Sequence, residues 1–338
     1  MRPEMQQLGK FSRRQAVKAL AGFAGSIALS IVHAQSRKTG VPVIGVLSAN
    51  RIDDREIDAI RAGLREAGYT EGANVAIDQL SADSQYDRLP ALATELVQRQ
   101  VALIIAIGGT VSALAAKKTT TTLPILFTTA GDPVKLGLVS NLRRPGGNLT
   151  GVTWLGSGLG GKRVEILHQM LPAATMIGLL VNPANPSLAS ERGEIEAAAR
   201  GFGQRIHVES ASDMAHIDAA FAKFAEQRVD AVILAADAVF MRRQQQILAL
   251  ATRYRLPTMY PLREFVSAGG LASYGASRTD AYLLIGRYAG RVLKGERPGE
   301  LPVQQSTKLV LAINLTAAKI LGLKLSSNFL ARADEVIE

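Results

Sequence analysis

From Val41 onward, the chain alternates short apolar runs with longer amphipathic stretches. Short continuous apolar runs are typical of strands that are buried on both faces, and longer stretches with helical periodicity are typical of surface helices. Repeated strand–helix units of this kind build a parallel sheet that is covered by helices. The feature therefore predicts an α/β fold. The sequence has no internal repeat of fixed period and no low-complexity segment, which excludes a solenoid.

The alternation divides into two series. The first has expected strands at residues 41–47, 75–79, 102–107 and 125–127, and expected helices at 54–67, 89–98 and 110–118. A break at 143–148 and a Gly-rich segment at 156–161 follow. The second has expected strands at 176–181, 205–209 and 231–235, and expected helices at 162–171, 187–200, 217–227 and 240–254. We therefore expect two similar lobes, to which the tail adds a helix at 280–294, an extended segment at 301–307, a strand at 308–313 and a helix at 315–321.

The N-terminal residues do not follow this pattern. Residues 1–18 are polar and basic, residues 19–32 are apolar, and Val32-His33-Ala34 resembles a small-x-small cleavage site. The apolar stretch is shorter than the roughly 20 residues that a membrane-spanning helix needs. We therefore expect a signal peptide over residues 1–34, cleaved near Ala34, and no stable membrane anchor. Residues 12–18 resemble a twin-arginine export motif, although Ala16 stands where Phe is usual and an Arg pair also occurs in ordinary Sec signals.

Composition excludes several classes of function. The chain has no cysteine, which removes disulfides, thiolate catalysis, cysteine-ligated metal sites and a lipid-attachment residue. Its formal net charge is +10, but the Lys and Arg residues are scattered and aromatic residues make up only 5% of the chain. Nucleic-acid binding needs clustered basic residues with aromatic stacking partners, so we expect a solvated basic surface and no nucleic-acid partner.

No pattern for catalysis, metal or cofactor binding stands out. His168, His207 and His216 are isolated from one another and from carboxylates at metal-ligand spacing. The sequence has no convincing Ser/His/Asp arrangement and no G-x-S-x-G elbow, and the turn at Gly108, Gly109 and Thr110 is not a nucleotide loop of the GxxxxGK[ST] or GxGxxG type. We therefore expect no catalytic residue, no metal and no cofactor.

Candidate binding residues of the first lobe directly follow its strands, because ligands bind at the carboxyl ends of parallel strands. They are Ser48, Asn50, Gly109, Thr110, Thr128 and Asp132. Gly109 and Thr110 open a helix, where backbone amides and a hydroxyl suit a ligand carboxylate, and Asp132 suits a ligand ammonium. Turns and helix caps use the same residue types, and that alternative remains open.

The second lobe offers fewer candidates. Asn182 and Asp237 each follow a strand, and Asp237 occupies the topological position that Asp132 has in the first lobe. Asn182 is weak evidence, because Asn-Pro pairs are common in turns. Trp154 and Tyr274 lie near the proposed lobe boundaries. Each is expected either to stack on a ligand or to pack the hinge.

Several ordered motifs resemble one known family. They are LPILF at 123–127, DPVKLGLV at 132–139, RPGGNLTG at 144–151, GGLASYG at 269–275 and ADEVI at 333–337. Together they make the chain similar, from Val41 to Glu338, to the ABC transporter substrate-binding proteins related to tryptophan-binding lipoproteins. Relatives include proteins for aromatic amino acids, but the resemblance does not fix the ligand.

The resemblance implies a type I periplasmic binding protein: two Rossmann-like lobes with parallel sheets, joined by a three-crossover hinge. With crossings near Gly151, Leu271 and Pro302, the N-terminal lobe would comprise residues 41–150 plus 272–301, and the C-terminal lobe residues 151–271 plus 302–330. Gly151, Gly269 and Gly270 would serve as hinge residues.

The implied function is that of a periplasmic solute-binding component, which captures a small organic ligand such as an amino acid or an aromatic compound by hinge closure and docks on an ABC permease in the inner membrane. Because this leader lacks the lipid-attachment cysteine of several relatives, a free periplasmic protein is expected. Two alternatives remain: a sensing protein that presents its closed form to a membrane receptor, and a periplasmic enzyme on the same fold.

Overall fold

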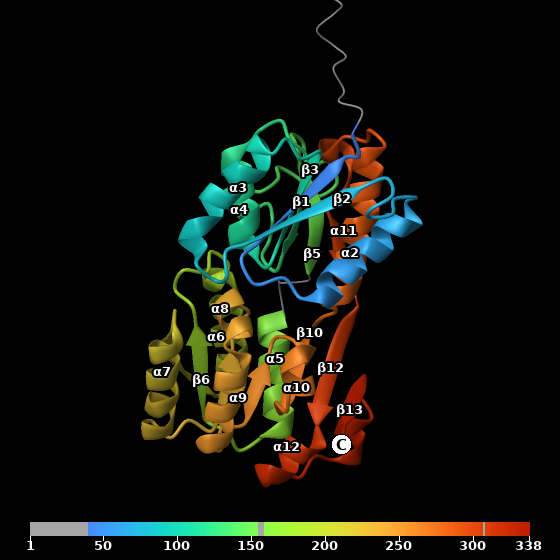
Figure 1. Cartoon of the computed structure of the whole chain (residues 1–338). Coiled ribbons are helices and arrows are strands. Elements are labelled where there is room, and N and C mark those ends of the chain that lie inside the picture. The colour runs from blue at the N-terminus through green and yellow to red at the C-terminus, as the bar shows by residue number, and fades with distance from the viewer. Residues whose placement is uncertain (1–39, 155–158, 307) are drawn as a thin grey trace, which may run out of the picture. The chain divides into compact units, whose positions relative to one another are not determined.

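The computed structural model describes residues 40–154, 159–306 and 308–338, of which residues 41–338 form one compact unit. The expected signal peptide and the twin-arginine motif lie outside the described residues. The α/β fold predicted from the alternating pattern is confirmed: two mainly parallel sheets, each covered by helices, form two lobes (Figure 1). Within the described part of the chain, no helix is long and apolar enough to cross a membrane.

The first lobe is built on a sheet with strand order β11-β5-β4-β3-β1-β2, and every pairing in it is parallel. Its strands are β1 (Val43–Ser48), β2 (Ala76–Ser81), β3 (Leu103–Ile107), β4 (Ile125–Thr129), β5 (Leu149–Trp154) and β11 (Gln304–Ser306). The central strands β3 and β4 are buried along their whole length. The continuous apolar sequence of β3 and the apolar residues 125–127 of β4 therefore reflect helices on both faces.

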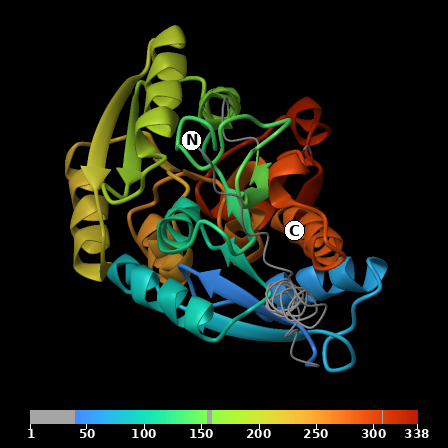
Figure 2. The ribbon, with the colours of Figure 1, turned by 90° about the horizontal axis from the view of Figure 1, so that it is seen from above.

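Two pairs of helices cover this sheet. They are α3 (Leu89–Gln98) with α4 (Thr110–Thr119) on one face and α2 (Asp54–Glu66) with α11 (Arg278–Leu293) on the other. Short 3₁₀ turns, η2 (Tyr86–Arg88) and η3 (Pro298–Glu300), lie in the connections. Helices α2 and α11 lie side by side (Figure 2) because glycines face each other: a Cβ on Gly286 would lie 2.2 Å from the carbonyl oxygen of Ile60. This contact holds the middle of α11 against α2.

The second lobe is built on a sheet with strand order β13-β12-β10-β9-β8-β6-β7. Its strands are β6 (Met176–Val181), β7 (Arg205–Ser210), β8 (Ala231–Leu234), β9 (Thr258–Tyr260), β10 (Ala272–Ala276), β12 (Leu309–Asn314) and β13 (Glu335–Ile337). One face packs on α5 (Leu159–Met170), α6 (Leu188–Gly201), α12 (Leu315–Ile320) and α13 (Ser327–Leu330). The other packs on α7 (Met214–Glu226), α8 (Ala238–Arg242), α9 (Gln244–Arg253) and α10 (Arg263–Ser267).

The chain passes between the sheets at three places, each later in the sequence than expected. It leaves the first sheet after Trp154 of β5, returns after Ala276 of β10 and leaves again after Ser306 of β11. The expected boundaries at 150/151, 271/272 and 301/302 are therefore wrong by a few residues. The physical reason is that each crossing occurs only where a parallel strand has ended, at the carboxyl edge of its sheet.

Two consequences follow from these crossings. Gly151 lies inside β5, where a Cβ would lie 2.1 Å from the carbonyl oxygen of Phe127, so it permits close strand packing and is not a hinge residue. Strand β12 starts at the edge where the other strands end, and it therefore runs antiparallel to β10. The second sheet is therefore mainly parallel, with one antiparallel pair.

Candidate functional site

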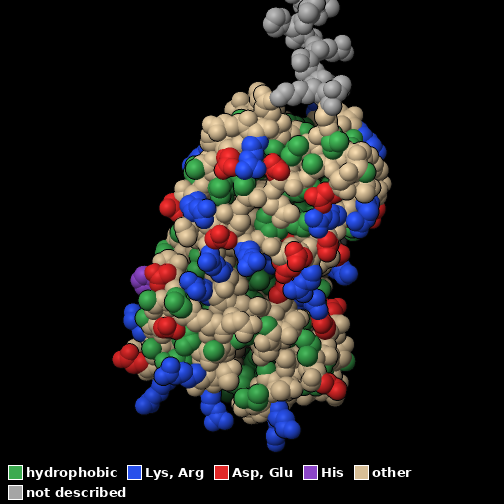
Figure 3. Space-filling view, viewed as in Figure 1, with side chains coloured by type: hydrophobic (Ala, Val, Ile, Leu, Met, Phe, Trp, Pro, Cys, Tyr) green, Lys and Arg blue, Asp and Glu red, His purple; other side chains and the backbone are tan. Residues whose placement is uncertain are grey.

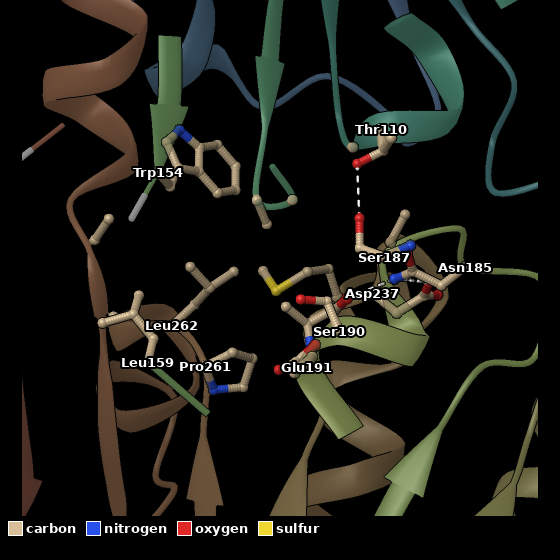
Figure 4. Close-up of a pocket in the computed structure, with 18 of the residues that line it drawn as sticks. Thr110, Trp154, Leu159, Asn185, Ser187, Ser190, Glu191, Asp237, Pro261 and Leu262 are labelled. Carbon is tan, nitrogen blue, oxygen red and sulfur yellow. Dashed lines mark hydrogen bonds between the residues drawn. The ribbon is translucent and has the colours of Figure 1, made fainter. Parts of the chain in front are cut away.

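A cavity of about 150 Å³ lies between the two lobes, at the carboxyl ends of their strands (Figure 4). A protein cavity of about this size accommodates a benzene ring. Both lobes line it: Gly109, Thr110 and Trp154 come from the first, and Ser187 and Asp237 from the second. The cavity occupies the place where open α/β sheets bind their ligands.

On the first lobe, the start of α4 lines the cavity. Gly108 and Gly109 have φ angles of +77° and +126°, a conformation that favours glycine and brings the backbone to the cavity wall. No side chain caps α4, and its first turn contains no acidic residue. Its first amide groups and the positive end of its dipole are therefore available to an anion.

Thr110 connects this helix to the opposite lobe. Its Oγ1 lies 2.7 Å from Thr129 Oγ1 and 3.0 Å from Ser187 Oγ (Figure 4). Ser187 is the residue immediately before α6. Like α4, α6 has no side-chain cap. Two helix starts, one from each lobe, therefore meet at one end of the cavity.

On the second lobe, Asp237 is a half-buried carboxylate at the cavity wall. Its Oδ1 accepts hydrogen bonds from Asn182 Nδ2 (2.9 Å) and the Val239 amide (2.8 Å), and its Oδ2 accepts one from Asn185 Nδ2 (3.0 Å). Burial raises the pKa of Asp237, and these hydrogen bonds counteract part of that rise. Within the described residues, no cationic side chain contacts Asp237, so its charge lacks a counter-ion from the protein.

Two arginines that line the cavity are already paired. Arg163 Nη2 lies 2.6 Å from Glu191 Oε1, and both side chains are almost fully buried. Arg278, at the start of α11, forms an ion pair with Glu56 of α2 and lies 3.8 Å from Glu264 of α10. These pairs leave the region around Arg163 and Arg278 close to neutral.

The other end of the cavity is apolar. Trp154, at the end of β5, lies over it from the first lobe, while Leu159, Pro261 and Leu262 lie across from the indole on the second (Figure 4). The indole ring meets Tyr282 edge-on with 6.4 Å between ring centroids, which fixes its orientation. The cavity is thus divided into a polar half around Thr110, Ser187 and Asp237 and an apolar half beneath Trp154.

Of the residues proposed from the sequence, six line the cavity: Asn50, Gly109, Thr110, Asp132, Trp154 and Asp237. Two of them also have the ordinary structural role that was left open. Asp132 Oδ1 accepts hydrogen bonds from the Val134 and Lys135 amides, and Asp237 caps α8. Capping and exposure to the cavity therefore occur together at both carboxylates.

The other four do not line the cavity. Ser48 lies beneath the Gly108 turn, and Asn182 holds Asp237 from behind. Thr128 is fully buried, whereas the next residue, Thr129, contacts Thr110. Tyr274 packs on the core of the second lobe, whereas the next residue, Gly275, lines the cavity. Adjacent residues of a strand face opposite sides, so an error of one residue reverses the direction of the side chain.

Sequence reasoning did not identify several lining residues: Tyr86, Leu159, Arg163, Asn185, Ser187, Ser190, Glu191, Pro261, Leu262 and Arg278. Tyr86, Pro261 and Arg278 follow β2, β9 and β10, and the rule of strand ends applied to these strands would have pointed to them. Arg163 lies within α5, and no sequence signal shows which face of that helix meets the cavity. Among the residues that the structure describes, no group of three or more His, Asp or Glu side chains is placed to hold a metal.

Comparison with known proteins identifies similar chains. A tyrosine-binding protein of Clostridioides difficile (strain R20291) is 27% identical over 267 residues, which cover 78% of this chain and 76% of that protein. A solved ABC domain from Streptococcus pneumonia in complex with L-Trp is 25% identical, with a TM-score of 0.81 over 88% of this chain and 100% of that chain. A ligand-free, open structure of a substrate-binding protein with adhesive properties from Clostridium difficile is also 25% identical, with a TM-score of 0.62 over 88% of this chain and 99% of that chain.

At equal identity, the chain superposes better on the L-Trp complex than on the open structure, which agrees with the direct hydrogen bond between Thr110 and Ser187 across the cleft. Its fold is that of the type I periplasmic binding proteins. The model of a family of solute-binding proteins, described as ABC transporter substrate binding protein, matches residues 41–337. The chain therefore belongs to the ABC transporter substrate-binding protein family, as its motifs indicated.

Proposed function

We propose that the chain captures one amino acid with an aromatic or large apolar side chain and presents it to an ABC permease. The observation that carries this proposal is the division of the cavity into a polar half, with a helix start and an unpaired carboxylate, and an apolar half under Trp154. A zwitterionic head group with an apolar body matches both halves.

The polar half suits the two charges of an α-amino acid. The ligand carboxylate would lie at the start of α4, near Gly109 and Thr110, and the ligand ammonium against Asp237. The two positions are adjacent (Figure 4). The hydroxyl of Ser187 contacts Thr110, and the amide of Ser187 donates a hydrogen bond to Asn185 Oδ1. The Asn185 side chain in turn donates a hydrogen bond to Asp237. An α-carbon separates its two charged groups by a similarly short span.

The apolar half suits the side chain of the ligand. Trp154 on one side and Leu159, Pro261 and Leu262 on the other would enclose a flat ring, and aromatic pairs contribute about 0.5–1.5 kcal/mol beyond their buried area. The ligands of the two relatives, tyrosine and L-Trp, are amino acids with such rings.

Delivery would follow the mechanism expected for this family. Ligand contacts to both lobes favour the closed state, the three crossing segments absorb the rotation, and the closed form docks on the permease. The basic leader with its apolar stretch supports export to the periplasm with cleavage near Ala34. Acidic and basic side chains are interspersed over much of the face in Figure 3, which supports a solvated surface and no role in nucleic-acid binding.

The test is a ligand panel measured on the purified protein by isothermal titration calorimetry and thermal unfolding. The panel contains the twenty amino acids, with glucose and adenosine as ligands that lack both charges. We expect saturable binding of aromatic amino acids, because a ligand that binds only the folded state raises the melting temperature. Recovery of unaltered ligand would separate binding from catalysis. The proposal fails if no amino acid binds or if a sugar or nucleoside binds more tightly.

A further inference from the structure

We propose that Tyr86 of the first lobe completes the ammonium site on the second lobe, so that closure of the cleft depends on the amine of the ligand. This inference rests on the function proposed above and names a positioning residue for it. The chemical class that it selects is an α-amino acid with a free primary amine, as opposed to its deaminated, keto or hydroxy analogues.

The geometry shows a contact between the lobes at the carboxylate itself. The hydroxyl of Tyr86 lies 3.1 Å from Asp237 Oδ1, and both residues line the cavity. The other hydrogen-bond donors to Asp237, from Asn182, Asn185 and Val239, belong to the second lobe. Within the described residues, Tyr86 is thus the one donor to Asp237 that depends on the lobes being together.

Tyr86 is suited to act as a donor. Burial and the adjacent charge of Asp237 raise the pKa of the Tyr86 hydroxyl, so it remains protonated at physiological pH. Its ring packs against the core of the second lobe, while Ala238, next to Asp237, packs in a core cluster of the first. The two lobes therefore interlock around this hydrogen bond.

The loop that carries Tyr86 has a constrained backbone. Asp83 and Ser84 are consecutive non-glycine residues with φ angles of +51° and +64°, a strained conformation that persists only where the surroundings hold it. Arg242 of the second lobe donates a hydrogen bond to the Asp83 carbonyl oxygen. Strain of this kind is concentrated at functional sites.

Asn50 holds the same loop from the first lobe. Its carbonyl oxygen accepts a hydrogen bond from Ser81 Oγ (2.7 Å), and its Oδ1 accepts one from Ser84 Oγ (3.2 Å). The Ser84 amide also donates to the Ala49 carbonyl oxygen at 2.7 Å. These bonds connect the residues that follow β1 to the position of Tyr86, and they give Asn50 a positioning role in addition to its place in the cavity wall.

The hydrogen bonds at Asp237 leave room for one more donor. Oδ1 receives three donors, from Tyr86, Asn182 and Val239, whereas Oδ2 receives one, from Asn185. All four donors are neutral. A ligand ammonium at Oδ2 would supply the missing positive charge, whereas an analogue without the amine leaves a buried carboxylate uncompensated in the closed cleft, which is costly.

Several titratable groups surround Asp237. The hydroxyl of Tyr86 in η2 contacts it directly, and Glu191 of α6, which forms an ion pair with Arg163 of α5, contacts the neighbouring Ala236 amide. Arg242 of α8 donates to the Asp83 carbonyl oxygen. The cavity wall also contains Asp132, Lys135, Glu194 and Arg278, so the acid titration of ligand binding is assigned to Asp237 by comparison with Asp237→Asn.

The experiment compares Tyr86→Phe with Tyr69→Phe. The second variant removes a hydroxyl from a partly buried tyrosine of the first lobe that does not line the cavity. The probes are L-tyrosine and L-tryptophan, or whichever amino acid of the panel binds most tightly, with the deaminated counterparts 3-(4-hydroxyphenyl)propionate and indole-3-propionate. Affinity is measured by calorimetry from neutral to acid pH, and rates by surface plasmon resonance.

We expect Tyr86→Phe to bind the amino acid about 10-fold more weakly, mainly through faster dissociation, because a hydrogen bond to a charged group is lost. The ratio of the affinity of the unaltered protein to that of the variant should shrink as the pH falls. The reason is that a neutral carboxyl group accepts a weaker hydrogen bond than a carboxylate. Tyr69→Phe should match the unaltered protein. The deaminated analogues should bind at least about 100-fold more weakly than the amino acids.

Three outcomes would overturn the inference. An unchanged affinity of Tyr86→Phe removes the role of the hydroxyl. If Tyr86→Phe binds more weakly but the ratio of the two affinities does not vary with pH, the effect of Tyr86 arises from packing and not from its hydrogen bond to Asp237. Equal binding of the deaminated analogue removes the dependence on the amine. Binding of no amino acid by the unaltered protein is a distinct result, which overturns the proposed function together with the inference.

Discussion

The two lobes face the same cavity with different chemistry. At the start of α4, the first lobe presents backbone and hydroxyl groups: the glycine turn, the uncapped helix start, and Thr110. The second presents charged and amide side chains, namely Asp237 with its asparagines and the Arg163–Glu191 pair. Backbone groups change little with sequence, whereas side chains are replaced one at a time. We therefore infer that the start of α4 binds a feature common to many ligands and that the side chains around Asp237 contribute to which of them are accepted.

The strongest test of this contrast is Asp237→Asn, which removes the charge and keeps the shape. We expect the affinity for the amino acid to fall about 100-fold or more, because one partner of a buried ion pair is lost, at a cost of about 3 kcal/mol. Calorimetry measures the change. Asp218→Asn, at an exposed carboxylate of α7, is the matched control and should bind normally. An affinity within a few-fold of the unaltered protein would show that the second lobe does not recognise charge here.

A substitution at the helix start tests the first lobe. Gly109→Ala places a Cβ on a residue with φ of +126°, and Gly72→Ala does the same at +81° in a surface turn far from the cavity. Both should lose about 1–3 kcal/mol of unfolding free energy in urea titrations. Only Gly109→Ala should bind the amino acid about 10-fold more weakly, because one charge-assisted hydrogen bond is misplaced. Equal binding by the two variants would contradict the role given to the start of α4.

The smallest expected effect is that of mild acidification of the unaltered protein, which protonates only a fraction of the Asp237 carboxylates. Burial raises the pKa of Asp237, so affinity should be full above that pKa and fall as the pH drops through it. The fall should begin above the value of about 3.9 that is usual for an exposed aspartate. Calorimetry across the acid range measures it, with Asp237→Asn as the reference: its weak binding should stay flat. A parallel fall in both proteins would place the titrating group elsewhere.

The sequence predicted the fold well because the fold follows from local periodicity. Helices α3 and α4 and strand β6 occur within a residue of their expected ranges, since each is a strongly patterned segment. The helix expected at 240–254 is instead two helices, α8 and α9, divided at Arg243. The small element β13 and the reversed direction of β12 depend on pairing between distant segments, and local patterns do not contain that information.

The site was predictable to the extent that it follows strand ends. Gly109, Thr110 and Asp237 line the cavity because the carboxyl ends of parallel strands converge on one edge. Thr128 and Tyr274 were misplaced by one residue, and an exact strand end is the least certain part of such a prediction. Tyr86 acts on the opposite lobe, so its role follows only from the way the two lobes meet.

Trp154 has a practical consequence. It is the one tryptophan among the 338 residues, and it lies at the cavity wall. Its fluorescence therefore arises from a single place, where arrival of a ligand changes the polarity around the indole. The protein should act as its own optical sensor of occupancy without an added dye, and amino acids other than tryptophan can be titrated against a background free of other indoles.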